Sequence, residues 1–295
     1  FNAPLLPVMA SDLDQQLQER IKLPPGWRFR VFARDLGYPR MMQITPTGDL
    51  IVSSTREDRL LLVKADRNGD GISDGSVVLK DKLDAPHGLV LEGNTLFVAE
   101  QTRVVAYDFD GERLTDERTV LSGVPDSGGG HITRTLKRGP DGWLYLTIGS
   151  SCNACLEDQP WRAAMIRFKE GGKAELFAQG LRNTVGFDWQ PGTGALYGVD
   201  NGRDNLGDDV PDDEVNRVEQ GRHYGWPFRH GQGVADPDLA PKAPARQSFT
   251  DPVHGLGARR EAVHGQRLAD IGFRDDEVVD VELVIVLGVR DRAIE

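Results

Sequence analysis

The chain of 295 residues carries 46 acidic and 35 basic side chains, for a formal net charge of −11. This acidic balance argues against a nucleic-acid-binding protein, which needs a basic face. No apolar stretch reaches the 18 or more residues of a membrane-spanning helix. The composition, 39% hydrophobic, is that of a globular protein with a large core that binds cations or neutral ligands.

The N-terminal segment, residues 1–22, contains the only convincing helical pattern. SDLDQQLQERI (11–21) predicts a short helix with Ser11 as its N-cap. From residue 23 onward the sequence consists of short apolar runs that end in Gly, Asp or Asn, which indicates β-strands joined by tight turns.

A repeat identifies the fold. A Gly, Asn or Asp turn followed by an apolar run recurs as TPTGDLIVSS, LEGNTLFVAE, GPDGWLYLTIG and PGTGALYGVD. The leucines that mark these runs are 46, 48 and 52 residues apart: Leu50, Leu96, Leu144 and Leu196. This spacing is close to one four-stranded propeller blade. A β-sandwich would not require such a period, so the sequence predicts an all-β propeller.

The blades are expected within residues 23–258. Further strands are predicted in RLLLVKADRNGD, RVVAYDFDGE and AAMIRFKEGG. FRHGQGVADPDLAPKAPARQ (228–247) is rich in Pro, Gly and Ala and indicates an excursion between strands. Residues 259–295 form a divergent tail, too short for the further blades that propellers of this kind usually need.

Two short segments carry candidate catalytic residues. His131 follows three glycines, which allow a ligand to approach the backbone, and it is either a general base or a hydrogen-bonded loop histidine. Arg182 and Asn183 lie in a Gly-bounded turn before a strand. This arginine either stabilises a carboxylate or a developing oxyanion, or caps a turn at the surface.

Two loops are rich in oxygen ligands. Between Asp200 and Glu219 there are eight carboxylates and two arginines, a composition that suits Ca²⁺ or, alternatively, a solvated acidic loop. Residues 66–74 (DRNGDGISD) match the opening of an EF-hand loop, but Val77 stands where the bidentate Glu is needed. An Asx-rich hairpin turn is therefore favoured there.

The two cysteines form one CxxC pair, Cys152 and Cys155. Such a pair can be a redox couple, half of a zinc site or a structural disulfide. The absence of other cysteines favours a structural disulfide in an oxidising compartment.

The ordered segments GPDGWLYLTIGS, GLRNTVG and DDEVNRVEQGRHYGWP resemble the glucose/sorbosone dehydrogenase family. Members of that family are six-bladed propellers that use pyrroloquinoline quinone (PQQ) and Ca²⁺. The similarity runs from LPPGWRFRVFA (23–33) to HYGWPF (223–228) and is closest to the L-sorbosone and pyranose dehydrogenase branch.

The resemblance implies roles for individual residues. His131 matches the histidine that takes the proton from the anomeric hydroxyl of the sugar, while hydride passes to the quinone. Arg182 matches the arginine that stabilises charge on a quinone oxygen, and Asn183 lies beside it at the cofactor. Gly202 and Arg203 occupy the cofactor-binding positions whose backbone carbonyls hold the calcium, with Arg203 in place of a proline.

A second, structural calcium site is implied for Glu214 and the Tyr224 carbonyl. Two departures from the family pattern stand beside these matches. Ser150 replaces an aspartate that orients the catalytic histidine, so the surroundings of His131 must differ. After residue 258 the sequence no longer matches, as expected of a truncated or divergent end, and Arg259, Arg260 and Arg267 do not replace the missing basic clamp for the cofactor.

The resemblance therefore implies a PQQ- and calcium-dependent dehydrogenase of an aldose or sorbosone-type sugar, periplasmic or secreted. Its electrons would pass to an external acceptor, which could be a quinone, a cytochrome or a dye. A calcium-dependent lactonase on a propeller and an inactive propeller fragment remain the alternatives.

Overall fold

The computed structural model describes residues 28–207, 210–255 and 282–286. The predicted helix at 11–21 and most of the 259–295 tail lie outside these residues. The chain divides into two compact units, one formed by residues 1–81 and 262–295, the other by residues 82–261.

The first unit contains one four-stranded antiparallel sheet and one parallel strand pair. The sheet consists of β2 (Pro39–Ile44), β3 (Leu50–Ser54), β4 (Arg59–Val63) and β5 (Ser76–Lys80), in that order. A 3₁₀ turn, η1 (Thr55–Glu57), joins β3 to β4. The parallel pair is β1 (Arg28–Ala33) with β20 (Glu282–Val286), so a strand of the divergent tail pairs with the strand that precedes the sheet.

The loop at 66–74 connects β4 to β5 as an Asx-rich turn, which confirms the favoured interpretation. The Asp66 carboxylate accepts hydrogen bonds from the backbone N–H groups of Gly69 (2.7 Å) and Gly71 (2.6 Å). Its oxygens therefore satisfy the backbone of the turn itself.

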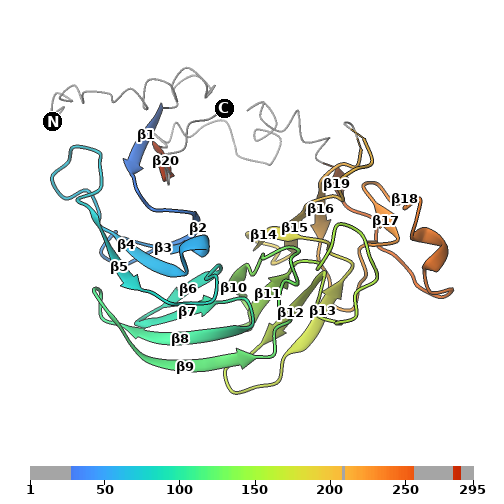
Figure 1. Ribbon diagram of the computed structural model, residues 1–295, viewed down its shortest axis with the longest axis horizontal. Coiled ribbons are helices and arrows are strands. Elements are labelled where there is room, and N and C mark those ends of the chain that lie inside the picture. Colours follow the sequence, from blue (N-terminus) through green and yellow to red (C-terminus); the bar gives the residue numbers. More distant parts are fainter. Residues whose placement is uncertain (1–27, 208–209, 256–281, 287–295) are drawn as a thin grey trace. The chain divides into compact units, whose positions relative to one another are not determined.

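The second unit contains three four-stranded antiparallel sheets, which follow one another along the chain (Figure 1). The first consists of β6 (Leu89–Glu92), β7 (Thr95–Ala99), β8 (Arg103–Phe109) and β9 (Leu114–Ser122). The second consists of β10 (Leu136–Arg138), β11 (Leu144–Ile148), β12 (Ala164–Phe168) and β13 (Glu175–Gln179).

The third sheet is interrupted by the predicted excursion. It consists of β14 (Thr184–Trp189), β15 (Leu196–Asp200), β16 (Glu214–Arg217) and β19 (His254–Gly255). Between β16 and β19 the chain forms a small hairpin, β17 (Arg229–His230) with β18 (Val234–Ala235), and a 3₁₀ turn, η2 (Ala240–Lys242). The fourth strand of this blade thus comes only after the excursion.

These four sheets confirm the propeller prediction and the repeat on which it depends. Each marker leucine lies in the second strand of its sheet, within β3, β7, β11 and β15. Every residue of β11 is buried, and this strand lies between two neighbouring strands of its sheet. The repeat of about 48 residues therefore corresponds to one turn and one buried apolar strand in each sheet.

In the second unit the first strand of each sheet faces the next sheet. The Gly88 N–H, before β6, donates to Arg134 O before β10 (3.0 Å). The Thr135 hydroxyl donates to Val185 O in β14 (2.8 Å). Apolar side chains fill the space between the sheets, with Phe97, Leu146 and other residues of the first two sheets forming one cluster. These first strands are the inner strands of adjoining blades.

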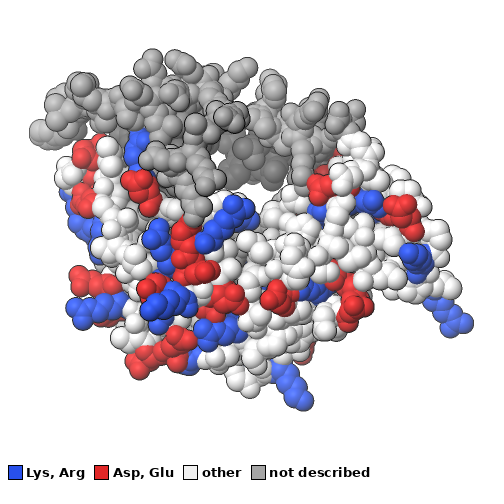
Figure 2. Space-filling model, in the orientation of Figure 1, with Lys and Arg blue, Asp and Glu red and all other residues white. Residues whose placement is uncertain are grey.

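Charged side chains of both signs are interspersed on the face drawn in Figure 2. Ion pairs among the described residues include Arg138 with Glu92 (2.5 Å) and Arg118 with Asp108 (2.8 Å). Within the described ranges, no helix is long and apolar enough to cross a membrane.

Candidate active site

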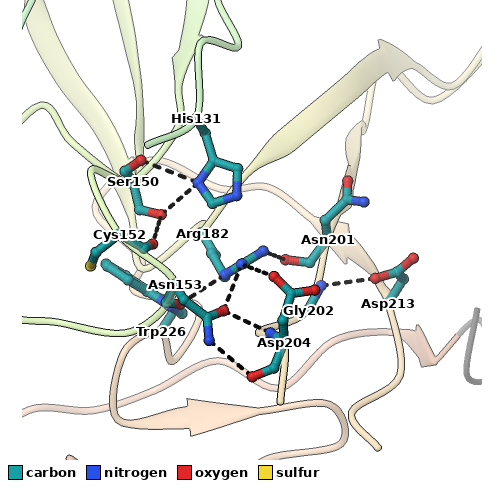
Figure 3. A network of polar contacts seen from close by, with 10 residues as sticks. All are labelled: His131, Ser150, Cys152, Asn153, Arg182, Asn201, Gly202, Asp204, Asp213 and Trp226. Carbon is teal, nitrogen blue, oxygen red and sulfur yellow. Dashed lines mark hydrogen bonds and ion pairs between the residues drawn. The ribbon is translucent and has the colours of Figure 1, made fainter. Parts of the chain in front are cut away.

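The candidate residues gather at one end of two adjoining blades. His131 precedes β10, and the loop from Ser150 to Cys155 follows β11. On the next blade Arg182 precedes β14, and the loop that begins at Asn201 follows β15. In an antiparallel sheet the start of one strand and the end of its neighbour share an edge, so these four segments meet (Figure 3).

Hydrogen bonding to Ser150 fixes the tautomer of His131. The imidazole Nδ1 lies 2.9 Å from the Ser150 hydroxyl and 3.1 Å from the Ser150 carbonyl oxygen. That hydroxyl donates its own proton to the Cys152 carbonyl (2.6 Å), and a carbonyl can only accept. Nδ1 is therefore the protonated nitrogen, and the lone pair of the neutral ring is on Nε2, as a general base requires.

Close packing at Gly149 brings the histidine to Asn183. A Cβ atom at Gly149 would lie 2.5 Å from the His131 Cβ and 2.9 Å from the Asn183 Oδ1. One at Gly130 would lie 2.4 Å from the Ser151 backbone. Glycine is required at both positions. Because Gly149 lies against both His131 and Asn183, these two residues occupy one site.

Arg182 is buried, with 3% of its side chain exposed, and the protein holds its guanidinium on several sides. Its Nε donates to Asn153 O (2.9 Å), and Nη1 donates to Asn201 O (3.2 Å). Its Nη2 donates to Asn153 Oδ1 (2.8 Å) and forms an ion pair with the half-exposed Asp204 carboxylate (3.0 Å). The arginine is thus a fixed cation in the interior, and the surface-cap alternative is excluded.

Cys152 and Cys155 are joined by a disulfide, as the sequence favoured. Asn153 lies inside this short ring and, besides Arg182, contacts the next blade: its Nδ2 donates to Asp204 O (2.9 Å). Nothing in SSCNAC indicates that the partners of Asn153 lie on another blade, so the sequence alone does not predict a role for this residue.

Asp200, at the end of β15, is a second residue whose role the sequence does not predict, because it belongs to an acidic loop. Its buried carboxylate accepts from the backbone N–H groups of Arg182 (2.9 Å) and Asn183 (2.7 Å) and from the Thr184 hydroxyl (3.0 Å). Burial raises the pKa of Asp200 to about 7, although these donors lower it. The carboxylate fixes the turn that presents Arg182.

Glu214 lies directly opposite Asp200 in the β15–β16 register. Burial, and then the Asp200 charge, raise the pKa of Glu214 to about 8. Its Oε2 accepts from Asn216 Nδ2 (3.2 Å). The Tyr224 hydroxyl donates to Arg217 O (2.6 Å), so the Tyr224 side chain has a structural role. Two adjacent buried carboxylates form an environment that a divalent cation would stabilise.

Gly202 and Arg203 lie in the loop after β15. The Gly202 N–H donates to Asp213 Oδ1 (2.8 Å), and a Cβ atom there would lie 2.8 Å from Pro211. The Arg203 side chain forms an ion pair with the buried Asp236. Arginine has no side-chain oxygen, so the backbone carbonyl is the atom of Arg203 that could bind a calcium ion.

Two buried amide oxygens beside this loop, Asn183 Oδ1 and Asn201 Oδ1, accept no hydrogen bond from the described part of the chain. A buried acceptor without a donor is costly, and an incoming N–H group or cation would satisfy both. They fit a ligand that brings such groups.

The sheets define a β-propeller in which polar residues gather at one end of two adjoining blades. The chain belongs to the TrAA12-like family, whose model matches residues 21–222. It is 26% identical over 242 residues to the pyrroloquinoline quinone-dependent sugar dehydrogenase of Hypocrea jecorina, covering 68% of this chain and 55% of that one.

Solved structures share the fold. A Trichoderma reesei enzyme of carbohydrate-active family AA12 aligns with a TM-score of 0.69 at 22% identity, covering 80% of this chain and 71% of that one. The PQQ-bound aldose sugar dehydrogenase of Streptomyces coelicolor aligns with a TM-score of 0.61 at 22% identity, covering 77% and 70%. The chain spans 66%, 43% and 55% of three curated relatives, from Borreliella burgdorferi, Synechocystis and Hypocrea jecorina, and thus less than two thirds of their length.

Proposed function

We propose that the chain is the propeller of a PQQ- and calcium-dependent dehydrogenase that oxidises an aldose or sorbosone-type sugar by hydride transfer to the quinone. The observation that carries this proposal is His131, whose Nε2 lone pair is fixed by Ser150 on one blade while the buried Arg182 cation is fixed on the next. Its relatives are sugar dehydrogenases, which supports the reaction class.

The residues present fit a calcium ion and one quinone oxygen of the cofactor. The unpartnered amide oxygens of Asn183 and Asn201, with the Gly202 and Arg203 carbonyls, are the hard oxygen ligands that Ca²⁺ prefers. Arg182 adds a cation for a quinone oxygen. Glu214 is proposed to hold a second calcium together with the Tyr224 carbonyl, since the buried Asp200 carboxylate lies directly opposite it in the sheet.

The residues of the candidate site have distinct roles in this chemistry. His131 Nε2 would accept the proton of the anomeric hydroxyl, and the Ser150 hydroxyl would hold the resulting imidazolium through Nδ1. Arg182 would lower the energy of negative charge that develops beside it, while Asp204 offsets part of its field. When bound, the calcium–quinone pair would supply the two-electron acceptor.

We further propose a periplasmic or secreted location and an external electron acceptor, a quinone, cytochrome or dye. The Cys152–Cys155 disulfide supports an oxidising compartment.

Reconstitution tests the proposal. The chain would be titrated with PQQ in the presence of Ca²⁺, and dye reduction would be followed with several aldoses and sorbosone. Saturable cofactor binding and sugar-dependent reduction are expected, with Arg182→Lys strongly impaired and the exposed Arg118→Lys unchanged. Lactone hydrolysis without PQQ would favour the lactonase alternative, and failure to saturate with PQQ would favour an inactive fragment.

A further inference from the structure

We infer that Asn153 is a positioning residue that locks the guanidinium of Arg182, and that the disulfide loop carrying it couples the base on one blade to the cation on the next. The inference deepens the proposed function and rests on it. It starts from a juxtaposition that the fold creates, since Asn153 follows β11 whereas its partners Arg182 and Asp204 belong to the next blade.

The chemistry at this position is specific to asparagine. The Oδ1 of Asn153 accepts from the Asp204 backbone N–H (2.7 Å) and from Arg182 Nη2 (2.8 Å), while its Nδ2 donates to Asp204 O (2.9 Å). The Asp204 N–H can only donate and the Asp204 carbonyl can only accept, so the orientation of the amide is determined. Aspartate lacks the donor, alanine lacks both groups, and glutamine is one methylene too long.

The backbone of Asn153 contributes as well. Its carbonyl accepts from Arg182 Nε (2.9 Å) and from the indole N–H of the buried Trp226 (3.2 Å). Together with the side chain, one residue therefore contacts the arginine at two of its nitrogens, which fixes both the position and the plane of the guanidinium.

The loop that holds Asn153 also holds the histidine. The Cys152 carbonyl accepts from the Ser150 hydroxyl, which in turn accepts from His131 Nδ1. The disulfide closes the ring around Asn153, and Glu157 anchors the start of the loop through the Ser151 N–H (2.6 Å) and hydroxyl (2.7 Å). Figure 3 shows this continuous chain of contacts from His131 to Asp204.

A neutral amide is important at this place because Arg182 already forms an ion pair with Asp204 and lies in the field of the buried Asp200 carboxylate. A further carboxylate in direct contact would offset more of the charge that the guanidinium needs to stabilise a developing anion. Asn153 holds the arginine without neutralising it, which separates its role from that of a simple ion-pair partner.

The test compares Asn153→Ala and the isosteric Asn153→Asp with Asn94→Ala, a control in the exposed β6–β7 turn. Two readouts are used on the full chain. The first is solvent exchange of the Arg182 Nη2–H in the apoprotein, since Nη2 is the nitrogen that donates to the Asn153 side chain, by NMR with ¹⁵N-labelled arginine, assigned through Arg182→Lys. The second is kcat and the sugar KM after reconstitution with PQQ and Ca²⁺.

In Asn153→Ala we expect faster Arg182 Nη2–H exchange and a fall in kcat on the order of 10- to 100-fold, with KM changed less than about threefold. In Asn153→Asp the exchange should stay slow while kcat falls, because the cation is held but neutralised. Asn94→Ala should match the wild type in both readouts.

Wild-type exchange and kcat in Asn153→Ala would overturn the inference, as would a kcat close to wild type in Asn153→Asp. If the wild-type chain itself neither binds PQQ nor turns over, the proposed function fails. The exchange measurement still decides whether Asn153 locks Arg182.

Discussion

Replacing Ser150 by alanine would remove the hydroxyl that lies between the His131 ring and the Cys152 carbonyl. Ser150 is fully buried, and its hydroxyl makes two hydrogen bonds, to Nδ1 at 2.9 Å and to Cys152 O at 2.6 Å. The Ser150 backbone carbonyl, 3.1 Å from Nδ1, stays in place as a second acceptor. The alanine variant therefore weakens the orientation of the base without abolishing it.

The size of the effect follows from the bonds that change. One neutral hydrogen bond contributes about 1 kcal/mol, because water competes for both partners in the reference state. We therefore expect kcat/KM to fall roughly 5- to 10-fold in Ser150→Ala. His131→Ala removes the base itself, for which a loss of about 10²- to 10⁴-fold is expected.

The assay is steady-state dye reduction by the reconstituted enzyme, with Ser122→Ala, an exposed serine at the end of β9, as the matched control. A kcat/KM within twofold of wild type in Ser150→Ala would refute the orienting role of the hydroxyl. A loss of kcat/KM as large as that of His131→Ala would also contradict a purely orienting role, since Ser150 would then take part in the reaction itself.

The remaining predictions concern stability and metal. Asp200→Asn leaves a buried N–H facing an NH₂ group, so the free energy of unfolding in urea should fall by about 1–3 kcal/mol, less the stability regained from weaker repulsion with Glu214. The control Asp108→Asn, at an exposed position, should change the free energy of unfolding by under about 0.5 kcal/mol. Equal effects of the two substitutions would contradict the role of Asp200. Calcium at 100 times its dissociation constant should stabilise the wild type by about 2.7 kcal/mol. Glu214→Gln should lose the part of this stabilisation that comes from the second calcium site. If calcium raised the melting temperature of the variant as much as that of the wild type, Glu214 would be excluded as a ligand. Burial lowers the pKa of His223 to about 4 from 6.5, so this group costs nothing above pH 6.5, and stability falls as the pH decreases from 6.5 to 4, by about 3 kcal/mol at most. His223→Gln should flatten that part of the profile, and an identical slope in both proteins would refute the assignment.

The fold could be predicted because each blade repeats a local signal. The turn residues before β3, β7, β11 and β15 and the apolar runs after them are contiguous in sequence, so the repeat is visible without any long-range contact. The inserted hairpin at β17 and β18 could also be expected, because Pro and Gly interrupt the strand pattern there. The tail beyond 258 offered no such signal.

The site could be predicted only where a residue type is unusual for its place. His131 and Arg182 stood out because a titratable or charged side chain follows glycines before an apolar strand. Asn153 and Asp204, by contrast, are 51 residues apart, and an asparagine in a CxxC loop resembles any turn residue. Asp200 belongs to a run of eight carboxylates, and only burial distinguishes it from exposed members such as Asp204 and Glu219.

The blade before the histidine explains why His131 can be held so firmly although glycines precede it. In that blade the loop after β7 supplies support: Gln101 Nε2 donates to Ile132 O (2.9 Å), and Gln101 O accepts from Arg134 Nε (3.0 Å). Arg134 is fully buried and also donates to Pro125 O (2.6 Å) and Thr133 O (2.7 Å). Burial lowers its pKa to about 9, which still leaves it charged at neutral pH. A buried cation needs these carbonyl partners, so the Arg134 contacts fix the backbone that directly follows His131.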